Sequence, residues 1–509
     1  MGNSPHVVSI HVLDDDSLLN IFYLYRPFFL GEDEKDYYRL TGGIAGWDRG
    51  RWWYPLAHVC QRWRNIILGS ASYLGLSLVC TRGTPVQNML AHSPPFPLTV
   101  DYTGVDDVTA EDEEGLLLAL KQRHRVRHLR LAFPVQNLQK FVMAIDEEFP
   151  ILEYLIVGPP VQVNTVLMLP ETLQAPNLHH LLLGCFIHPI RPRLHPTATG
   201  LVTLTLIINR RSAYFQPNVL LQWISFMPQL ERLEIAFKFP VPNRDVERQL
   251  THAPITTHIT LPNLRLFWFQ GVSTYSEAIV SWITAPRLED LQIQFSKQLT
   301  FSVPRLPQFM NTIENLRLND AVIRFQDKKM YVGMFIRETG DVSRCTFSVN
   351  VDCWHFDWQV SSAVQISNAL SQLFSTVEHL TLEHEVHSLS SEEHNDVDRI
   401  MLRNLLRSFS NVKILRFEDG LVEGLSHCLR LEDGEPPLEL LPELQELTYY
   451  GGRDIGNAFT SFIDSRQNAG RPLTLIHYNP NPSASESSLK SQIPTIASAG
   501  GEAGRDVDT

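Results

Sequence analysis

Cysteine is sparse in this chain of 509 residues, and no two cysteines stand at the C-x-x-C spacing of metal or redox sites. The six cysteines are scattered, and several lie inside apolar runs: Cys60, Cys80, Cys185, Cys345, Cys353 and Cys428. This pattern is typical of buried free thiols in a reducing compartment. We therefore expect a cytoplasmic or nuclear protein, or one found in both.

Long hydrophobic runs and a surplus of basic residues are also missing. No stretch approaches the ~18 apolar residues of a membrane span, and the first residues lack the charged and apolar regions of a secretory signal. The formal net charge is −13, whereas nucleic acids and anionic membranes bind basic surfaces. The sequence thus predicts a chain whose principal partners are neither nucleic acids nor membranes.

The usual signatures of catalytic and cofactor sites are absent as well. The sequence has no GxxxxGK(S/T), GxGxxG, GxSxG or HExxH motif. Its richest histidine cluster has no cysteine at a zinc-ligand spacing, and we interpret it as exposed loop histidines: His379, His384, His387 and His394. We expect no catalysis, no cofactor and no metal site. An enzyme with an unfamiliar site on a concave face is the alternative.

Two amphipathic segments stand near the N-terminus. In residues 11–25, the run Asp14–Asp16 places acidic residues at the positive end of a helix, on which Leu18, Phe22 and Tyr25 share one face. In residues 53–79, apolar residues recur at helical spacing: Leu56, Val59, Cys60, Trp63, Ile66 and Ile67. Pro55 suits a first turn and Gly69 a C′ position, so we predict one helix between them, followed by a short third segment.

The order of these segments resembles an F-box, the small helical module that docks on the Skp-type adaptor of cullin-RING ubiquitin ligases. The resemblance is carried by SLLNIF, by LAHVCQRWRNI and above all by Val-Cys-x-x-Trp-Arg before an apolar pair. The family usually begins with Leu-Pro, whereas here Asp14 follows Leu13, and residues 27–52 form an insertion. The resemblance implies that nine residues contact the adaptor or form the module's own core: Leu13, Leu18, Leu19, Phe22, Leu56, Val59, Cys60, Trp63 and Ile67.

A short apolar-x-x-apolar-x-apolar pattern recurs twelve times from Val126 onward, with a mean period of about 29 residues. The copies are Val126/Leu129/Leu131, Leu152/Leu155/Val157, Leu178/Leu181/Leu183, Leu201/Leu204/Leu206, Leu230/Leu233/Ile235, Leu264/Phe267/Phe269, Leu288/Leu291/Ile293, Ile313/Leu316/Leu318, Val342/Cys345/Phe347, Val377/Leu380/Leu382, Val412/Leu415/Phe417 and Leu444/Leu447/Tyr449. In the second half of each copy, apolar residues occupy every other position, as on one face of a strand. Between several copies the apolar spacing is helical. Because no single unit can close such a core, each must pack on its neighbours.

We therefore predict an α/β fold: a small N-terminal helical F-box-like module followed by an array of parallel strands with helices on the outer face. The array resembles the irregular leucine-rich-repeat solenoids found behind F-boxes, and a non-solenoid α/β arrangement is the alternative. The expected segments are 1–80 for the module, 81–124 for a connector and atypical first unit, 125–478 for the array and 479–509 for a disordered tail.

One aromatic cluster is a candidate for binding a client protein. Trp354, Phe356 and Trp358 alternate in CWHFDWQV, so in an extended segment they would share one face. Core filling is the competing role. By resemblance, the chain is expected to be the substrate receptor of an SCF-type ligase, joining the Skp-type adaptor and cullin complex to an unknown client. A leucine-rich-repeat scaffold without ligase function is the alternative.

Overall fold

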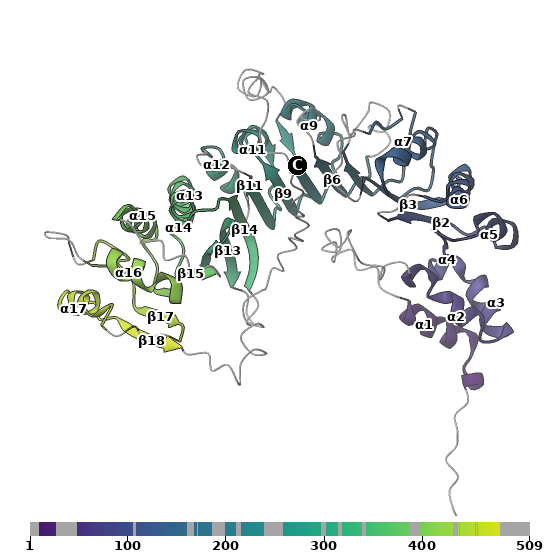
Figure 1. Ribbon diagram of the computed structural model, residues 1–509. Helices are drawn as coiled ribbons and strands as arrows, with labels where there is room; N and C mark the ends of the chain where they lie inside the picture. Colours follow the sequence, from purple (N-terminus) through teal and green to yellow (C-terminus); the bar gives the residue numbers. More distant parts are fainter. Residues whose placement is uncertain are drawn as a thin grey trace, which may run out of the picture. The chain divides into compact units, whose positions relative to one another are not determined.

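The computed structural model describes most of the chain (Figure 1). The described residues form two compact units, one up to Gly200 and one from Leu201 onward. The described residues are 10–26, 48–104, 108–159, 167–170, 172–185, 199–209, 215–238, 258–296, 302–313, 318–337, 343–385, 396–430, 436, 438–452, 455 and 457–478. Most of the expected insertion and all of the expected tail, residues 27–47 and 479–509, lie outside them.

The first unit begins with short helices. They are η1 (Ile10–Val12), α1 (Asp15–Tyr25), η4 (Asp48–Arg51), α2 (Trp53–Ala57), α3 (Gln61–Gly69) and α4 (Ala71–Leu74). The prediction of one helix between Pro55 and Gly69 was wrong. The helix is interrupted at His58–Cys60. Cys60 has an extended backbone, and its Sγ caps α3 by accepting the Trp63 N–H at 3.5 Å. Gly69 ends α3, and the glycine in a left-handed cap is Gly75, after α4 (φ 62°).

Five parallel strands follow in the first unit. They are β1 (Leu78–Thr81), β2 (Leu98–Thr103), β3 (Val126–Ala132), β4 (Tyr154–Val157) and β5 (His180–Gly184), and they neighbour one another in chain order. The helices between them are α5 (Val86–His92), α6 (Ala110–Lys121) and α7 (Val135–Met143). The side chain of Thr109 caps α6 by accepting the Asp112 N–H at 3.1 Å.

The second unit holds eleven sheet strands among its described residues, in the order β6-β7-β9-β11-β14-β13-β12-β15-β16-β17-β18. Their bounds are β6 (Thr203–Ile208), β7 (Arg232–Phe237), β9 (Leu266–Gly271), β11 (Asp290–Phe295), β12 (Asp320–Gln326), β13 (Lys329–Arg337), β14 (Ser343–Asp352), β15 (His379–Glu385), β16 (Ile414–Glu418), β17 (Glu446–Tyr450) and β18 (Thr474–Tyr478). Two short strands, β8 (Ile259–Thr260) and β10 (Ile283–Thr284), pair separately. All sheet pairings are parallel except those of β13, which runs against both β12 and β14.

Helices line one side of the second unit's strands, as Figure 1 shows for the row from α9 to α15. They are α9 (Pro217–Ile224), α11 (Ser273–Val280), α12 (Leu306–Met310), α13 (Phe356–Ala369), α14 (Ser371–Phe374), α15 (Asp396–Arg407), η6 (Asp419–Leu421), α16 (Val422–Cys428) and α17 (Thr460–Asn468). The fold is thus a mixed α/β fold with a large, mostly parallel sheet.

Ten of the twelve copies of the apolar pattern place their last two residues in strands that pair only in parallel. The register aligns these residues from strand to strand, for example Leu380, Leu415 and Leu447, and buries them. The copy ending in Phe347 lies in β14, which pairs parallel with β11 and antiparallel with β13. The copy ending in Leu318 was wrong, because that residue precedes β12, and Leu316 lies outside the described residues.

Candidate protein-docking site

Helices α1 and α3 pack on each other through apolar side chains that the sequence had marked. Leu18, Phe22 and Ile67 are almost completely buried. The ring of Phe22 meets that of Trp63 edge to face, with centroids 4.9 Å apart. Fully burying residues of this size stabilises a fold by about 1.5–3 kcal/mol each. These contacts hold the two helices together.

Polar contacts fix the start of α1 against α3. Arg62 donates from Nη2 to the Leu13 carbonyl oxygen at 2.6 Å and from Nε to the Asp15 carboxylate at 2.8 Å. Asp14 is the N-cap of α1, and its Oδ1 accepts the Ser17 N–H at 2.7 Å. That hydrogen bond lowers the pKa of Asp14. Asp14, which follows Leu13 where F-boxes usually have proline, therefore caps the N-terminus of α1 with its side chain.

We expect Asp14→Ala to loosen the first turn of α1, because the cap acceptor is lost. Amide hydrogen exchange of Ser17 should become faster, while Asp16→Ala, in the same turn, should change it little. Since the pKa of Asp14 is lowered in the folded state, its stabilising effect is present above the ordinary carboxyl pKa and is lost as pH falls through the lowered value. Equal exchange in the two variants would contradict the capping role.

The nine residues marked by the F-box resemblance fall into three groups. Leu18, Phe22 and Ile67 form the buried seam between the helices, and Val59 is 58% exposed. The remaining five are half-buried: Leu13, Leu19, Leu56, Cys60 and Trp63. The structure brings all nine into the same helical segment, but only part of the set is available to another protein.

Sequence reasoning missed a group of exposed apolar residues on α1. Ile21, Leu24 and Tyr25 lie at i, i+3 and i+4 on α1, and we name them the α1 stripe; Leu24 is 70% exposed. Tyr25 had been expected to share one face with Leu18 and Phe22. Unlike those two it is exposed; it is the last residue of α1, and its ring lies near that of Trp52, with centroids 6.4 Å apart. The signal in the sequence was the high proportion of apolar residues: Leu18–Tyr25 contains a single polar residue, Asn20. A helix that packs on one neighbour cannot bury apolar side chains on all its sides.

The predicted extended aromatic segment is partly helical. Phe356 and Trp358 lie in the first turn of α13, so alternate residues there point apart and the prediction of one shared face was wrong. Phe356 packs against Phe325 and His384, each with ring centroids 5.1 Å away. Trp354 is 66% exposed, and the Lys328 ammonium lies 5.1 Å from its ring centroid. Trp354 and Trp358, which is also exposed, therefore form the outward part of this cluster.

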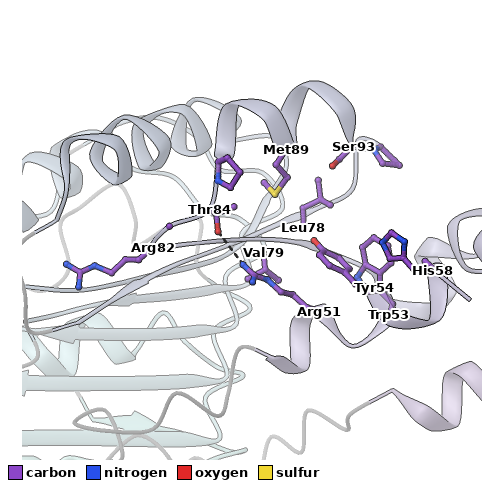
Figure 2. A pocket seen from close by; sticks show the side chains of 14 residues that line it. Arg51, Trp53, Tyr54, His58, Leu78, Val79, Arg82, Thr84, Met89 and Ser93 are labelled. Atoms are coloured by element: carbon purple, nitrogen blue, oxygen red, sulfur yellow. Dashed lines mark hydrogen bonds between the residues drawn. The ribbon is translucent and has the colours of Figure 1, made fainter.

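A cleft of about 460 Å³ lies in the first unit where α2 meets β1 and α5. Trp53 and Tyr54 contribute one wall and Met89 another, whereas Arg82 extends away from them (Figure 2). Arg51 donates to the hydroxyl oxygens of Thr81 and Thr84, at 3.0 and 3.3 Å. Among the described residues, the lining includes no carboxylate. The cleft therefore offers aromatic contact area rather than an acid–base pair.

The histidines are not where the sequence placed them. His379 and His384 lie within β15 and are half-buried, because the strand extends to Glu385, so the prediction of loop histidines was wrong for both. His379 Nδ1 lies 2.6 Å from Asp320 Oδ1. His387 and His394 lie outside the described residues. Within the described part of the chain, no three His, Cys, Asp or Glu residues are grouped as metal ligands would be.

Four of the six cysteines have the properties of structural thiols. Burial raises the pKa of Cys80 and Cys428 to about 12, and that of Cys345 and Cys353 to about 11. A thiol needs a low pKa to act as a nucleophile.

Helices of the length and apolarity that a bilayer crossing requires do not occur in the described residues.

The α1 stripe is thus a surface suited to a protein partner, since contiguous exposed apolar side chains mark such sites. Val59, in the turn between α2 and α3, is a further exposed apolar side chain of the module. The geometry is an apolar helix face held in place by a packed second helix. No protein-family model matches this chain, and no curated protein matches it either.

Proposed function

We propose that this protein is the substrate receptor of an SCF-type ubiquitin ligase. Its N-terminal helices form an F-box-like module that binds the Skp-type adaptor, and its strand–helix array is a leucine-rich-repeat solenoid that binds a client. The observation that carries the proposal is the exposure of apolar side chains on the helical module, namely the α1 stripe and Val59, which lies between α2 and α3.

The sequence order and the packing both support this role. The Val-Cys-x-x-Trp-Arg stretch supplies Trp63, which packs on α1 through Phe22, so the resemblance and the observed helix contact involve the same residues. The stripe residues are exposed instead of being consumed by that packing. Burying such side chains against a partner is the main source of affinity in protein interfaces.

The array supports the client-binding half of the proposal. Apolar residues such as Leu380, Leu415 and Leu447 align in register from strand to strand and are buried. Because this shared core holds neighbouring strands together, the segments that connect the strands are not needed to close it. Trp354 and Trp358 are the aromatic anchors expected to contact the client, since exposed tryptophans are enriched at binding hot spots. In this role the protein contributes proximity, because it holds a client lysine near the ubiquitin-charged enzyme, and it performs no chemistry itself.

The experiment is co-expression of the full chain with a Skp-type adaptor, followed by purification of the chain. Wild type should recover the adaptor in a stoichiometric complex. Leu24→Asp and Val59→Asp should each weaken that complex by roughly 100-fold, because an unpaired carboxylate would have to be buried in the interface. Both positions are exposed in the free chain, so the circular dichroism spectrum and the melting temperature should stay unchanged.

A matched control is available in the other unit. Ile400 on α15 is 57% exposed, and Ile400→Asp makes the same kind of change away from the helical module. It should leave the adaptor complex intact. Wild-type chain that is folded and recovers no adaptor would refute the proposal, as would equal loss in all three variants.

The second candidate is a scaffold of the same fold without ligase function. It is favoured by the burial of Leu18, Phe22 and Ile67, which assigns three of the nine candidate residues to the module's own core instead of to adaptor contact. This candidate predicts that proximity labelling in cells marks client proteins but no adaptor or cullin. It also predicts that a proteasome inhibitor leaves the abundance of those proteins unchanged.

A further inference from the structure

Strand β18 ends the strand order of the second unit, and within the described residues it pairs on one side only, with β17. All five of its residues, Thr474–Tyr478, are exposed. The sequence TLIHY has no proline and no lysine or acidic residue, which are the usual means of protecting a sheet edge from further pairing. By contrast, the three residues Leu78–Cys80 of β1, the terminal strand of the first unit, are buried.

The apolar core of the array reaches this edge without being closed. Leu415, Leu447 and Leu475 are register partners across β16, β17 and β18. The first two are completely buried, but Leu475 is 37% exposed. On the opposite face of β18, Ile476 and Tyr478 are exposed as well, and the ring of Tyr478 lies 5.3 Å from that of Tyr450. On both faces of β18, apolar side chains are therefore exposed at the edge that has no neighbouring strand among the described residues.

The hydrogen bonds to β17 show which backbone groups of β18 point outward. Thr474 donates its N–H to the Gln445 carbonyl oxygen at 2.9 Å, and the Tyr478 carbonyl oxygen accepts the Gly451 N–H at 3.3 Å. In a parallel pair, alternate residues direct both backbone groups to the same neighbour. Thr474, Ile476 and Tyr478 therefore face β17, and the N–H and C=O groups of Leu475 and His477 face the free edge.

We propose that this edge binds a second copy of the chain, with the two β18 strands pairing antiparallel about a two-fold axis at Ile476. That register places Leu475 opposite His477 of the second copy and His477 opposite its Leu475. Each pair exchanges two N–H···O bonds, so all four outward groups of each strand are satisfied. An interface of this kind uses the same patch on both subunits and closes at the dimer.

The same register matches the side chains. Ile476 meets Ile476 of the second copy directly, in a non-hydrogen-bonded pair, where side chains lie closest. Thr474 lies opposite Tyr478 on the same face. The main competing occupant is the segment that follows β18 in the sequence, residues 479–509. That segment contains Pro480, Pro482 and Pro494 and is rich in Ser, Ala and Gly, a composition that strands disfavour.

The first test is sedimentation of the full chain over a range of concentrations. Wild type should show a concentration-dependent dimer. Ile476→Asp should weaken association by at least about tenfold, because two carboxylates would face each other across the axis. Ile476→Val should preserve association, and Ile400→Asp serves as the matched control for loss of an exposed isoleucine. A monomer at every concentration, or a dimer that Ile476→Asp leaves unchanged, would overturn the proposal.

Cysteine cross-linking tests the register itself. Residues in a directly opposed non-hydrogen-bonded pair have Cα atoms about 4.5 Å apart, within the range of a disulfide. Ile476→Cys should therefore give a covalent dimer on mild oxidation. Leu475→Cys should not, because the two copies of residue 475 would be offset by about 7 Å along the strands.

Equal cross-linking of the two cysteine variants would overturn the two-fold register. Deletion of residues 479–509 tests the competing occupant. If the full chain is monomeric and the shortened chain dimerises, the edge belongs to the chain's own C-terminal segment and the second-copy proposal fails.

Discussion

Replacing Arg466 with methionine is expected to lower the free energy of unfolding of the second unit by about 3 kcal/mol. Arg466 lies on α17 with no exposed surface, and it donates to the carbonyl oxygens of Leu441, Pro442 and Leu444 at 2.8–3.1 Å. Leu441 has a left-handed backbone (φ 50°), which is unfavourable for a branched side chain. Methionine fills much of the volume but leaves buried carbonyl groups without donors.

The matched control for this effect is Arg407→Met. Arg407 is also an arginine of the second unit, but its side chain is 44% exposed and it pairs with Glu439 at 2.8 Å on the surface. An exposed ion pair contributes ~1 kcal/mol or less. Denaturant unfolding of the full chain, with hydrogen exchange of the β17 amides to report on this unit, measures the difference. Equal losses in the two variants would contradict the role assigned to Arg466.

The second large effect concerns Asp101 on β2, and it depends on pH. Both carboxylate oxygens of Asp101 are buried without a hydrogen-bond donor, and Arg130 Nη1 is 3.9 Å away. Burial raises the pKa of Asp101 to about 7, and the attraction of Arg130 opposes this only in part. The folded state therefore favours the protonated acid. The stability that Asp101 contributes is complete below the ordinary carboxyl pKa and is lost as pH rises through about 7.

We expect the free energy of unfolding of Asp101→Asn to exceed that of wild type at pH 8, by up to about 4 kcal/mol for a pKa shift of this size. This difference should disappear towards pH 4. Chemical unfolding of the full chain at several pH values measures this. His128 acts in the opposite direction, because burial lowers its pKa to about 4 and stability falls as pH drops below its ordinary value. Since His128 is present in both proteins, the difference between them isolates Asp101.

Much of the strand pattern could be predicted because burial imposes a simple period. A residue such as Leu415 must be apolar to fill the core, and its partner Leu447 must be apolar for the same reason. The additional strands β12 and β13 were not predicted, because the repeat pattern assigns one strand to each copy. Their signal was present as strict alternation in Ala321, Ile323 and Phe325, followed by a turn at Asp327 and Lys328.

The candidate site was harder to predict, because periodicity shows which residues share a face but not which face acquires a neighbour. Phe22 and Leu24 are both apolar residues of α1, yet one is buried against α3 and the other is 70% exposed. The helix break at Cys60 was missed for a related reason. The apolar spacing continues through the break, and only the thiol acting as a cap acceptor distinguishes it.

The antiparallel strand β13 leaves the direction of the flanking sheet unchanged. Because β13 runs against both of its neighbours, β12 and β14 run alike, and each joins the flanking sheet in parallel, at β15 and β11. The chain can therefore widen the sheet at this point while the flanking strands keep the same polarity. The repeating units before and after β13 therefore keep a common strand direction across this antiparallel step.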